Sequence, residues 1–339
     1  MSEPRFLKKI HVPQWLVLLL ALIFLFRIPS FFEPYYYGGE KPFSLYVSAA
    51  LAGNLFWLKA ILVGWMMGTT VLFWKLTKAL LPKEERIQIV SVWVFAALTT
   101  IPLLEGQTPN AELFITGPLI WGALLVFVAM KKPKIKSRIR LSKTFLFVTA
   151  WLFLSLFAVM LFERPRPHHL ILSVPPAAIL IGFLALKKNW EQTLSIIPLF
   201  ALVAVPVIFN FRHYDSVGYY GRFLRFATGA VGKEAYFSEF NSRAPRDYKL
   251  AQIIATTTAR EDPVFIWEDS VPIYALSRRL PPARKETIDD LASSPPKLVV
   301  ILPESSHFSE LRDFVAANYF LINEVEGAQI WKRADINFQ

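Results

Sequence analysis

Long apolar stretches recur along the N-terminal part of the chain and restrict its fold more than any other feature. A helix that spans a membrane needs roughly 20 mostly apolar residues. Seven stretches approach that length, and 54% of the 339 residues are hydrophobic. The stretches are approximately Val12–Phe32, Leu55–Leu81, Ile87–Leu104, Leu113–Met130, Thr144–Phe162, His169–Leu186 and Leu194–Phe211. We therefore predict an α-helical polytopic membrane protein with about seven spans.

Basic residues are distributed unequally over the connections between these stretches. Sixteen lie in the connections that share a side with the N-terminus, and five lie in the alternate set. Cytoplasmic loops carry an excess of Lys and Arg, so we predict a multi-pass protein of the cytoplasmic membrane with a cytoplasmic N-terminus. No small-residue cleavage site follows the first stretch, which we expect to be a retained anchor.

The net charge of +11 does not indicate a nucleic-acid partner. Residues 1–211 carry 21 Lys and Arg against 9 Glu, whereas residues 212–339 carry 16 basic and 17 acidic residues. The excess belongs to the loops of the membrane part, which indicates the lipid bilayer as the partner. The chain has no cysteine, so thiolate metal sites and cysteine nucleophiles are excluded.

The patterning divides the chain into two domains. We predict a transmembrane domain over residues 1–211 and an extracytoplasmic α/β domain over residues 212–339. In the latter, "DPVFIWED", "PKLVVILPE" and "AQIWKR" have the composition of strands. Two segments, "RDYKLAQIIATTTA" and "FSELRDFVAANYF", have helical spacing.

Glutamates of the membrane part fall into two groups. Four lie among basic residues of the cytoplasmic connections, where we expect solvated surface charges: Glu3, Glu84, Glu85 and Glu191. Five lie at predicted outer ends of helices: Glu33, Glu40, Glu105, Glu112 and Glu163. Ionisable groups near a membrane are candidates for function, so the outer group is the candidate site.

The outer group has polar neighbours suited to phosphate binding. Arg164 and Arg166 could hold a lipid phosphate through paired hydrogen bonds, and His168 and His169 could donate to it or relay a proton. Asn110 lies beside Glu112 in "EGQTPNAE". Adjacent histidines diverge on a helix and no third ligand has typical spacing, so no metal site is predicted.

Two further residues, Tyr36 and Tyr37, could stack on sugar rings or belong to an aromatic belt at the interface. A glutamate facing the phosphate could serve as the general base that deprotonates an acceptor hydroxyl.

Four segments in this order resemble a known family: "FRIPSFFEPYYYGGE", "LFWLKAILVGW", "TTIPLLEGQTPNAELF" and "RPRPHHLILSVPPAAIL". They are similar to bacterial C-type membrane glycosyltransferases of the protein mannosyltransferase and aminoarabinose transferase superfamily. The tail segments "EFNSRAPRDYKLAQIIATTT" and "VFIWEDSVPIYALSRRLPPAR" resemble the extracytoplasmic tail of the same group.

The resemblance implies transfer of a sugar from a polyprenyl-phosphate carrier to a lipid, glycan or protein acceptor outside the cytoplasmic membrane. It implies no certain cofactor, and it leaves a divalent metal unknown. In such proteins the first outer loop carries an Asp-Glu pair whose Asp is taken as the catalytic base.

At that position this chain has Gly39 and Glu40. Glu40-Lys41-Pro42 also fits the turn that ends the family's loop. No Asp precedes Asp215, so Glu40, Glu105 or Glu112 would have to replace the base.

Three functions stay open on the sequence. The first is an active glycosyltransferase with Glu40 or Glu105 as the base. The second is a catalytically inactive relative that binds polyprenyl phosphate or glycan, or that scaffolds an enzyme of the cell envelope. The third is a transporter or channel, which is disfavoured because inverted repeats and mid-membrane polar groups are not evident.

Overall fold

The structure of the protein is a computed structural model. It describes residues 12–34, 55–129, 141–162, 166–211, 214–267, 271–279, 291–292, 295–304 and 308–334. The chain divides into two compact units, residues 1–32 with 59–221 and residues 33–58 with 222–339. Each unit has hydrophobic cores of its own.

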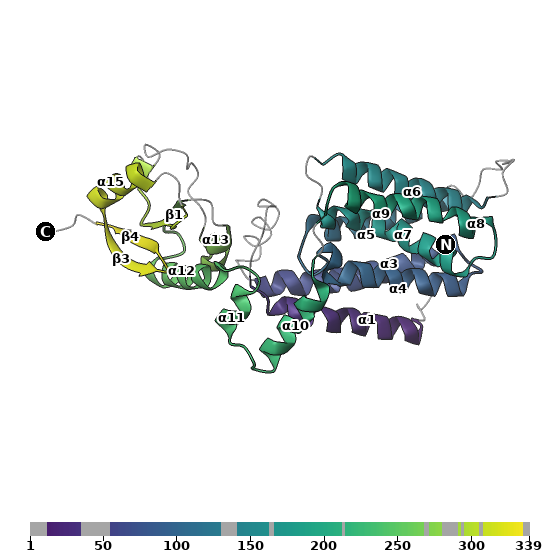
Figure 1. Ribbon diagram of the computed structural model, residues 1–339, viewed down its shortest axis with the longest axis horizontal. Helices are drawn as coiled ribbons and strands as arrows, with labels where there is room; N and C mark the ends of the chain where they lie inside the picture. The colour runs from purple at the N-terminus through teal and green to yellow at the C-terminus, as the bar shows by residue number, and fades with distance from the viewer. Residues whose placement is uncertain are drawn as a thin grey trace, which may run out of the picture. The chain divides into compact units, whose positions relative to one another are not determined.

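Unit 1 is built from helices that run alongside one another (Figure 1). Its α-helices are α1 (Gln14–Arg27), α3 (Leu55–Leu80), α4 (Glu85–Thr100), α5 (Ala111–Ala129), α6 (Lys143–Met160), α7 (Val174–Leu186), α8 (Trp190–Leu194) and α9 (Ile196–Ile208). Short 3-10 helices lie at their ends: η2 (Ile28–Phe31), η3 (Pro102–Leu104) and η4 (Pro167–Ser173). Helix α10 (Ser216–Ala227) follows and leads from unit 1 into unit 2.

Six helices in the described part of the chain are long and apolar enough to cross a membrane. They are Gln14–Phe31, Phe56–Leu80, Ala111–Val128, Lys143–Met160, Pro167–Leu186 and Trp190–Ile208. They correspond to six of the seven predicted stretches. The remaining stretch, Ile87–Leu104, corresponds to α4, which has 16 residues and a length of about 24 Å. A multi-pass membrane protein is therefore the class that these helices support.

Helix α7 forms the centre of unit 1. Of the span Pro167–Leu186, 72% is buried, more than in any other of the six spans. Helix α7 is apolar on all sides, so every face of it can pack against a neighbouring helix. Gly182 allows α4 to approach closely, since a Cβ there would lie 2.6 Å from Ser91 Oγ.

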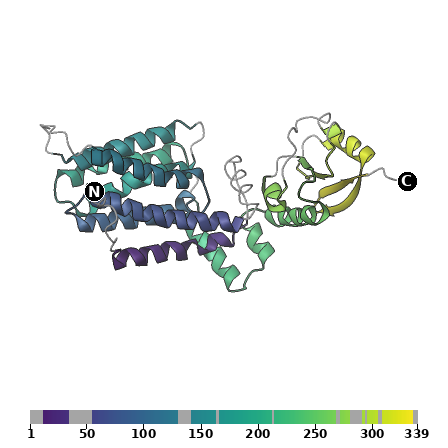
Figure 2. The ribbon, with the colours of Figure 1, turned by 180° about the vertical axis from the view of Figure 1, so that it is seen from behind.

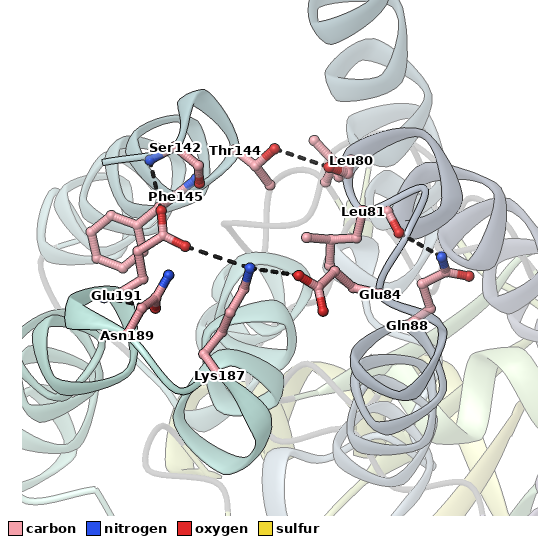
Figure 3. Close-up of polar contacts among 10 residues, drawn as sticks. All are labelled: Leu80, Leu81, Glu84, Gln88, Ser142, Thr144, Phe145, Lys187, Asn189 and Glu191. Carbon is pink, nitrogen blue, oxygen red and sulfur yellow. Dashed lines mark hydrogen bonds and ion pairs between the residues drawn. The ribbon is translucent and has the colours of Figure 1, made fainter. Parts of the chain in front are cut away.

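A polar network ties the helices together at the end of unit 1 where α7 terminates (Figure 3). Lys187 Nζ lies 2.8 Å from Glu84 Oε1 and 3.7 Å from Glu191 Oε2. Glu191 Oε1 accepts a hydrogen bond of 2.6 Å from the Ser142 N–H, directly before α6. Only 4% of Glu191 is exposed, so the expectation of a solvated surface charge is wrong for this residue. Helix packing buries the Glu191 side chain, and its carboxylate accepts a hydrogen bond from the backbone N–H that precedes α6.

Unit 2 contains a four-stranded sheet with the strand order β1-β2-β4-β3. Its elements are α11 (Lys233–Ser238), α12 (Ala244–Thr257), β1 (Val264–Trp267), α13 (Val271–Ser277), β2 (Leu298–Ile301), α15 (Phe308–Asn318), β3 (Tyr319–Val325) and β4 (Ala328–Arg333). Strands β1 and β2 are parallel, and the other two pairs are antiparallel. The three predicted strands are present as β1, β2 and β4. The sequence does not predict β3, and its first residues fall in the segment predicted to be helical.

Helices cover both faces of this sheet. Successive side chains of a strand point to opposite faces, and in β1 the side chains on both faces are apolar. Val264 and Ile266 of β1 share a core with α12 and α13. Phe265 points to the opposite face, where Val315 of α15 belongs to the same cluster. Tyr274 of α13 supports β1, since its hydroxyl accepts a 2.8 Å hydrogen bond from Ile266 N. The yellow strands of the sheet are visible from both sides (Figures 1 and 2).

We predict that Glu191→Ala lowers the free energy of unfolding by about 2 kcal/mol, because it removes the charged acceptor of the Ser142 N–H and a partner of Lys187. Unfolding of the purified protein in detergent, followed by tryptophan fluorescence, measures the change. Glu85→Ala is the matched control, since Glu85 is exposed and should cost less than about 0.5 kcal/mol. Equal losses in the two variants would contradict the role assigned to Glu191.

Candidate functional site

The candidate site lies at the end of unit 1 opposite the Lys187 network. Its residues come from the segment that joins α4 to α5, including the first turn of α5, and from η4, the 3-10 helix before α7. The first segment supplies Glu105, Asn110 and Glu112, and the second supplies His168 and His169. All five except Glu105 are buried. Tertiary packing thus brings together two polar segments that the sequence separates by two helices, α5 and α6.

Four predicted site residues lie outside the described residues: Tyr36, Tyr37, Glu40 and Arg164. Their assignment as catalytic or binding groups stays a prediction. Arg166 is described and partly buried, and it directly precedes η4.

Glu105 and His168 form the closest contact of the site. Glu105 Oε2 lies 2.8 Å from His168 Nδ1, across 63 residues of sequence. Glu105 has a left-handed backbone with φ 56°, so the chain turns sharply after η3. Gly106 permits the turn, because a Cβ there would lie 2.5 Å from the Thr99 carbonyl oxygen. A carboxylate only accepts hydrogen bonds, so His168 Nδ1 donates and its Nε2 holds the lone pair when the ring is neutral.

His169 is oriented by contacts on three sides. Its ring stacks on Phe162 with centroids 4.0 Å apart. The Arg166 N–H donates to His169 Nδ1 at 3.0 Å, so in the neutral ring the proton lies on Nε2. That nitrogen lies 3.7 Å from Glu112 Oε1. The two histidines therefore face two different glutamates, with their ring centroids 4.5 Å apart.

Two buried polar atoms of the site have no hydrogen-bond partner among the described residues. They are Glu112 Oε2 and Asn110 Nδ2, and their residues are 7% and 8% exposed. Buried polar atoms are almost always hydrogen-bonded in folded proteins, and an unmade bond costs about 1–3 kcal/mol. An acceptor and a donor are therefore available for a polar ligand beside the histidines.

Glu112, His168 and His169 could also hold a metal ion. One ligand atom from each lies within 4.8 Å of the others. The sequence predicts no metal site, because no third ligand has typical spacing from the two histidines. In the structure the possible third ligand is Glu112, which comes from α5 and is far from the histidines in sequence. The described hydrogen bonds oppose metal binding through His169 Nε2, because the Arg166 N–H holds the ring in the tautomer that protonates this nitrogen.

Two supporting residues were not identified from the sequence as part of the site. Arg27, at the end of α1, is 0% exposed and its Nη2 donates to the Thr99 carbonyl at 2.7 Å. Gln107 Nε2 donates to the Phe26 carbonyl at 3.0 Å. Together they attach the turn after η3 to the ends of α1 and α4. A charged residue at the end of an apolar stretch is the signal that could have identified Arg27.

Tyr220 of α10 extends this support. Its hydroxyl donates to the Phe26 carbonyl at 3.3 Å and accepts from Gln107 Nε2 at 3.4 Å. Burial raises the pKa of the Tyr220 phenol above its usual value of 10.0. The phenol therefore stays protonated at neutral pH and remains a donor to the end of α1.

Comparison of the chain with protein-family models, with curated proteins and with solved structures finds no match. The site must be interpreted from its own chemistry. It combines an acid–imidazole pair with a second carboxylate, which is buried, a second imidazole and an amide. Such groups can accept a proton and can bind a phosphate or a sugar hydroxyl.

We predict that Gly106→Ala destabilises the protein by about 2 kcal/mol, because the added methyl group meets the backbone of Thr99, which cannot move aside cheaply. Thermal unfolding in detergent measures the loss. Gly122→Ala is the control, since a Cβ at Gly122 meets no atom within 4 Å. A Gly106→Ala protein as stable as this control would disprove the close turn.

Proposed function

We propose that the protein is a membrane glycosyltransferase that moves a sugar from a polyprenyl-phosphate carrier to a lipid, glycan or protein acceptor. The observation that supports it most is the Glu105–His168 pair beside Glu112 and Asn110, at the end of a bundle with membrane-length helices. A carrier lipid would present its phosphate and sugar at that depth. The resemblance of "EGQTPNAE" and "RPRPHHL" to C-type glycosyltransferases is independent support.

In the proposed reaction, the acceptor hydroxyl gives its proton to Glu105 as the new bond to the anomeric carbon forms. The bond between the anomeric carbon and the phosphate oxygen breaks, and polyprenyl phosphate leaves with the electron pair. The Glu105 side chain is 29% exposed while His168 is 3% exposed, so the carboxylate is the accessible member of the pair. Glu40 stays a second candidate for the base on sequence grounds.

The leaving phosphate needs hydrogen-bond donors, and the candidate site offers them. His169 is turned toward the site by Phe162 and the Arg166 N–H, and Asn110 Nδ2 is an available donor. Arg166 and Arg164 add positive charge next to these groups in sequence. Donors of this kind stabilise the charge that develops on a leaving phosphate oxygen.

The proposed topology has seven crossings, a cytoplasmic N-terminus and an extracytoplasmic tail over residues 212–339. Two contacts support α4 as the seventh crossing. Glu84, directly before α4, pairs with Lys187 at one end of unit 1. Thr99, near the end of α4, accepts from Arg27 at the other. The 16 residues of α4 thus run between the two polar ends of the bundle. The excess of basic residues in one set of loops supports the proposed orientation in the membrane.

We predict that Glu105→Gln reduces sugar transfer at least about a hundredfold, because general bases contribute on the order of 10²–10⁴ in rate. Purified protein in liposomes, supplied with radiolabelled polyprenyl-phosphate sugars and total envelope acceptors, measures transfer. Glu85→Gln is the matched control at the opposite end of α4. His168→Asn should cost a similar factor, and the double variant should be little worse than either, since the pair acts as a unit.

Two results would contradict this assignment. Full activity in Glu105→Gln would exclude Glu105 as the base, and Glu40→Gln would then test the second candidate. Binding of polyprenyl phosphate by the unmodified protein without transfer to any acceptor would instead favour the inactive relative.

A further inference from the structure

A polar cavity lies at the end of unit 1 where α7 terminates. Its volume is about 550 Å³, within the range of sites that bind small molecules. One wall is the connection from α3 into the first turn of α4, and the other runs from the end of α7 into α8. The charged residues of its lining are Lys83, Glu84, Glu85, Arg86, Lys187 and Lys188.

Two contacts hold the walls of this cavity in place. Lys187 Nζ lies 2.8 Å from Glu84 Oε1, and this ion pair joins the two walls (Figure 3). Gln192 Nε2 donates to the Leu184 carbonyl at 2.9 Å, which attaches α8 to the end of α7. Because Lys187 and Glu84 carry opposite charges, they position the walls without adding net charge. The cavity is therefore a feature of the fold, and its other charged groups decide what it can bind.

The other charged groups make the cavity positive. Lys83, Arg86 and Lys188 are exposed, and within the described part of the chain they form no ion pair. Three cations thus face the single carboxylate of Glu85, which leaves a net charge of +2. The first turn of α4 adds backbone N–H groups that have no partner within the helix, and the helix dipole favours an anion there. The cavity is therefore suited to an anion with two negative charges.

The ends of the neighbouring spans place the cavity at the depth of lipid headgroups. The candidate spans Phe56–Leu80 and Pro167–Leu186 both end beside its walls. Trp190 follows Lys188 by two residues and is 78% exposed, and tryptophan is enriched where hydrocarbon meets the headgroups. Phospholipid phosphates of the adjacent leaflet lie at this depth, so they can reach the three cations.

We propose that this cavity binds the headgroup of an anionic phospholipid, and that it favours a lipid with two phosphates, such as cardiolipin, which matches the net charge of +2. Basic pockets between membrane helices on the cytoplasmic side recognise such headgroups, and the topology proposed above places this end there. Arg86 can hold one phosphate through paired hydrogen bonds, while Lys83 and Lys188 offer charge from the two walls. The bound lipid bridges the connections before α4 and after α7. This inference does not depend on the proposed sugar transfer.

The test compares the loss of two cations from the cavity with the same loss of charge elsewhere. The cavity variant combines Arg86→Gln with Lys188→Gln, and both side chains are exposed, so the fold should tolerate the change. The control variant combines Lys75→Gln with Lys78→Gln on α3, outside the lining. The purified full chain in detergent is titrated with cardiolipin, with phosphatidylcholine and with soluble glycerol 3-phosphate. Native mass spectrometry measures each Kd, and thermal unfolding without lipid checks that both variants are folded.

We expect the cavity variant to bind cardiolipin about tenfold more weakly than the unmodified protein, a loss of about 1.4 kcal/mol. The control variant should keep the affinity of the unmodified protein. Cardiolipin should also raise the Tm of the unmodified protein and of the control more than that of the cavity variant, because a ligand that binds only the folded state stabilises it.

Three results would overturn the proposal. Equal losses of cardiolipin affinity in the two variants would indicate a general attraction of basic residues to anionic lipid, with no site in the cavity. Equal affinity for cardiolipin and phosphatidylcholine would show that the anionic headgroup is not what the protein recognises. Glycerol 3-phosphate that binds as tightly as cardiolipin, and loses affinity in the cavity variant, would assign the cavity to a soluble phosphate.

Discussion

The organisation of unit 1 depends on one constraint, that backbone polar groups in hydrocarbon must find partners within the chain. A helix satisfies this constraint by hydrogen-bonding its backbone groups within its own segment, and the membrane-length segments are helical. They also contain few charged side chains, which are costly in hydrocarbon. Within the described residues of unit 1, irregular backbone lies at the helix ends, where η3, η4 and the turn around Glu105 are found. Polar chemistry in such a chain can therefore collect only at the ends of the bundle.

The two ends of unit 1 use their polar groups differently. At the end where α7 terminates, Glu191 and Lys187 contact each other, and Ser142 and Glu84 complete a closed set of bonds. That arrangement stabilises helix packing. At the other end, Glu112 and Asn110 are also buried, yet each keeps a polar atom without a hydrogen-bond partner among the described residues. Unmade bonds cost stability, so these two atoms are the groups at this end that could bind a polar ligand.

The sequence predicted unit 2 in part. Strands β1, β2 and β4 are short apolar runs between turn residues, and a local pattern of that kind is enough to identify them. The sequence does not predict strand β3, because most of its side chains are exposed. Its first two residues also continue the helical spacing of the segment that forms α15. The structure joins β3 to β4 through the two-residue turn Glu326-Gly327, with both residues at positive φ, and in the sequence Gly327 is the signal for such a hairpin.

The sequence by itself determined that the chain forms membrane-length helices, because the length of an apolar run sets the preference for hydrocarbon locally. It also determined that acids, histidines and arginines occur at one set of helix ends. Only the tertiary structure decided that Glu105 meets His168, that Glu112 meets His169, and that Glu191 is buried. Each of these contacts depends on how helices far apart in the sequence pack, which spacing along one segment does not encode.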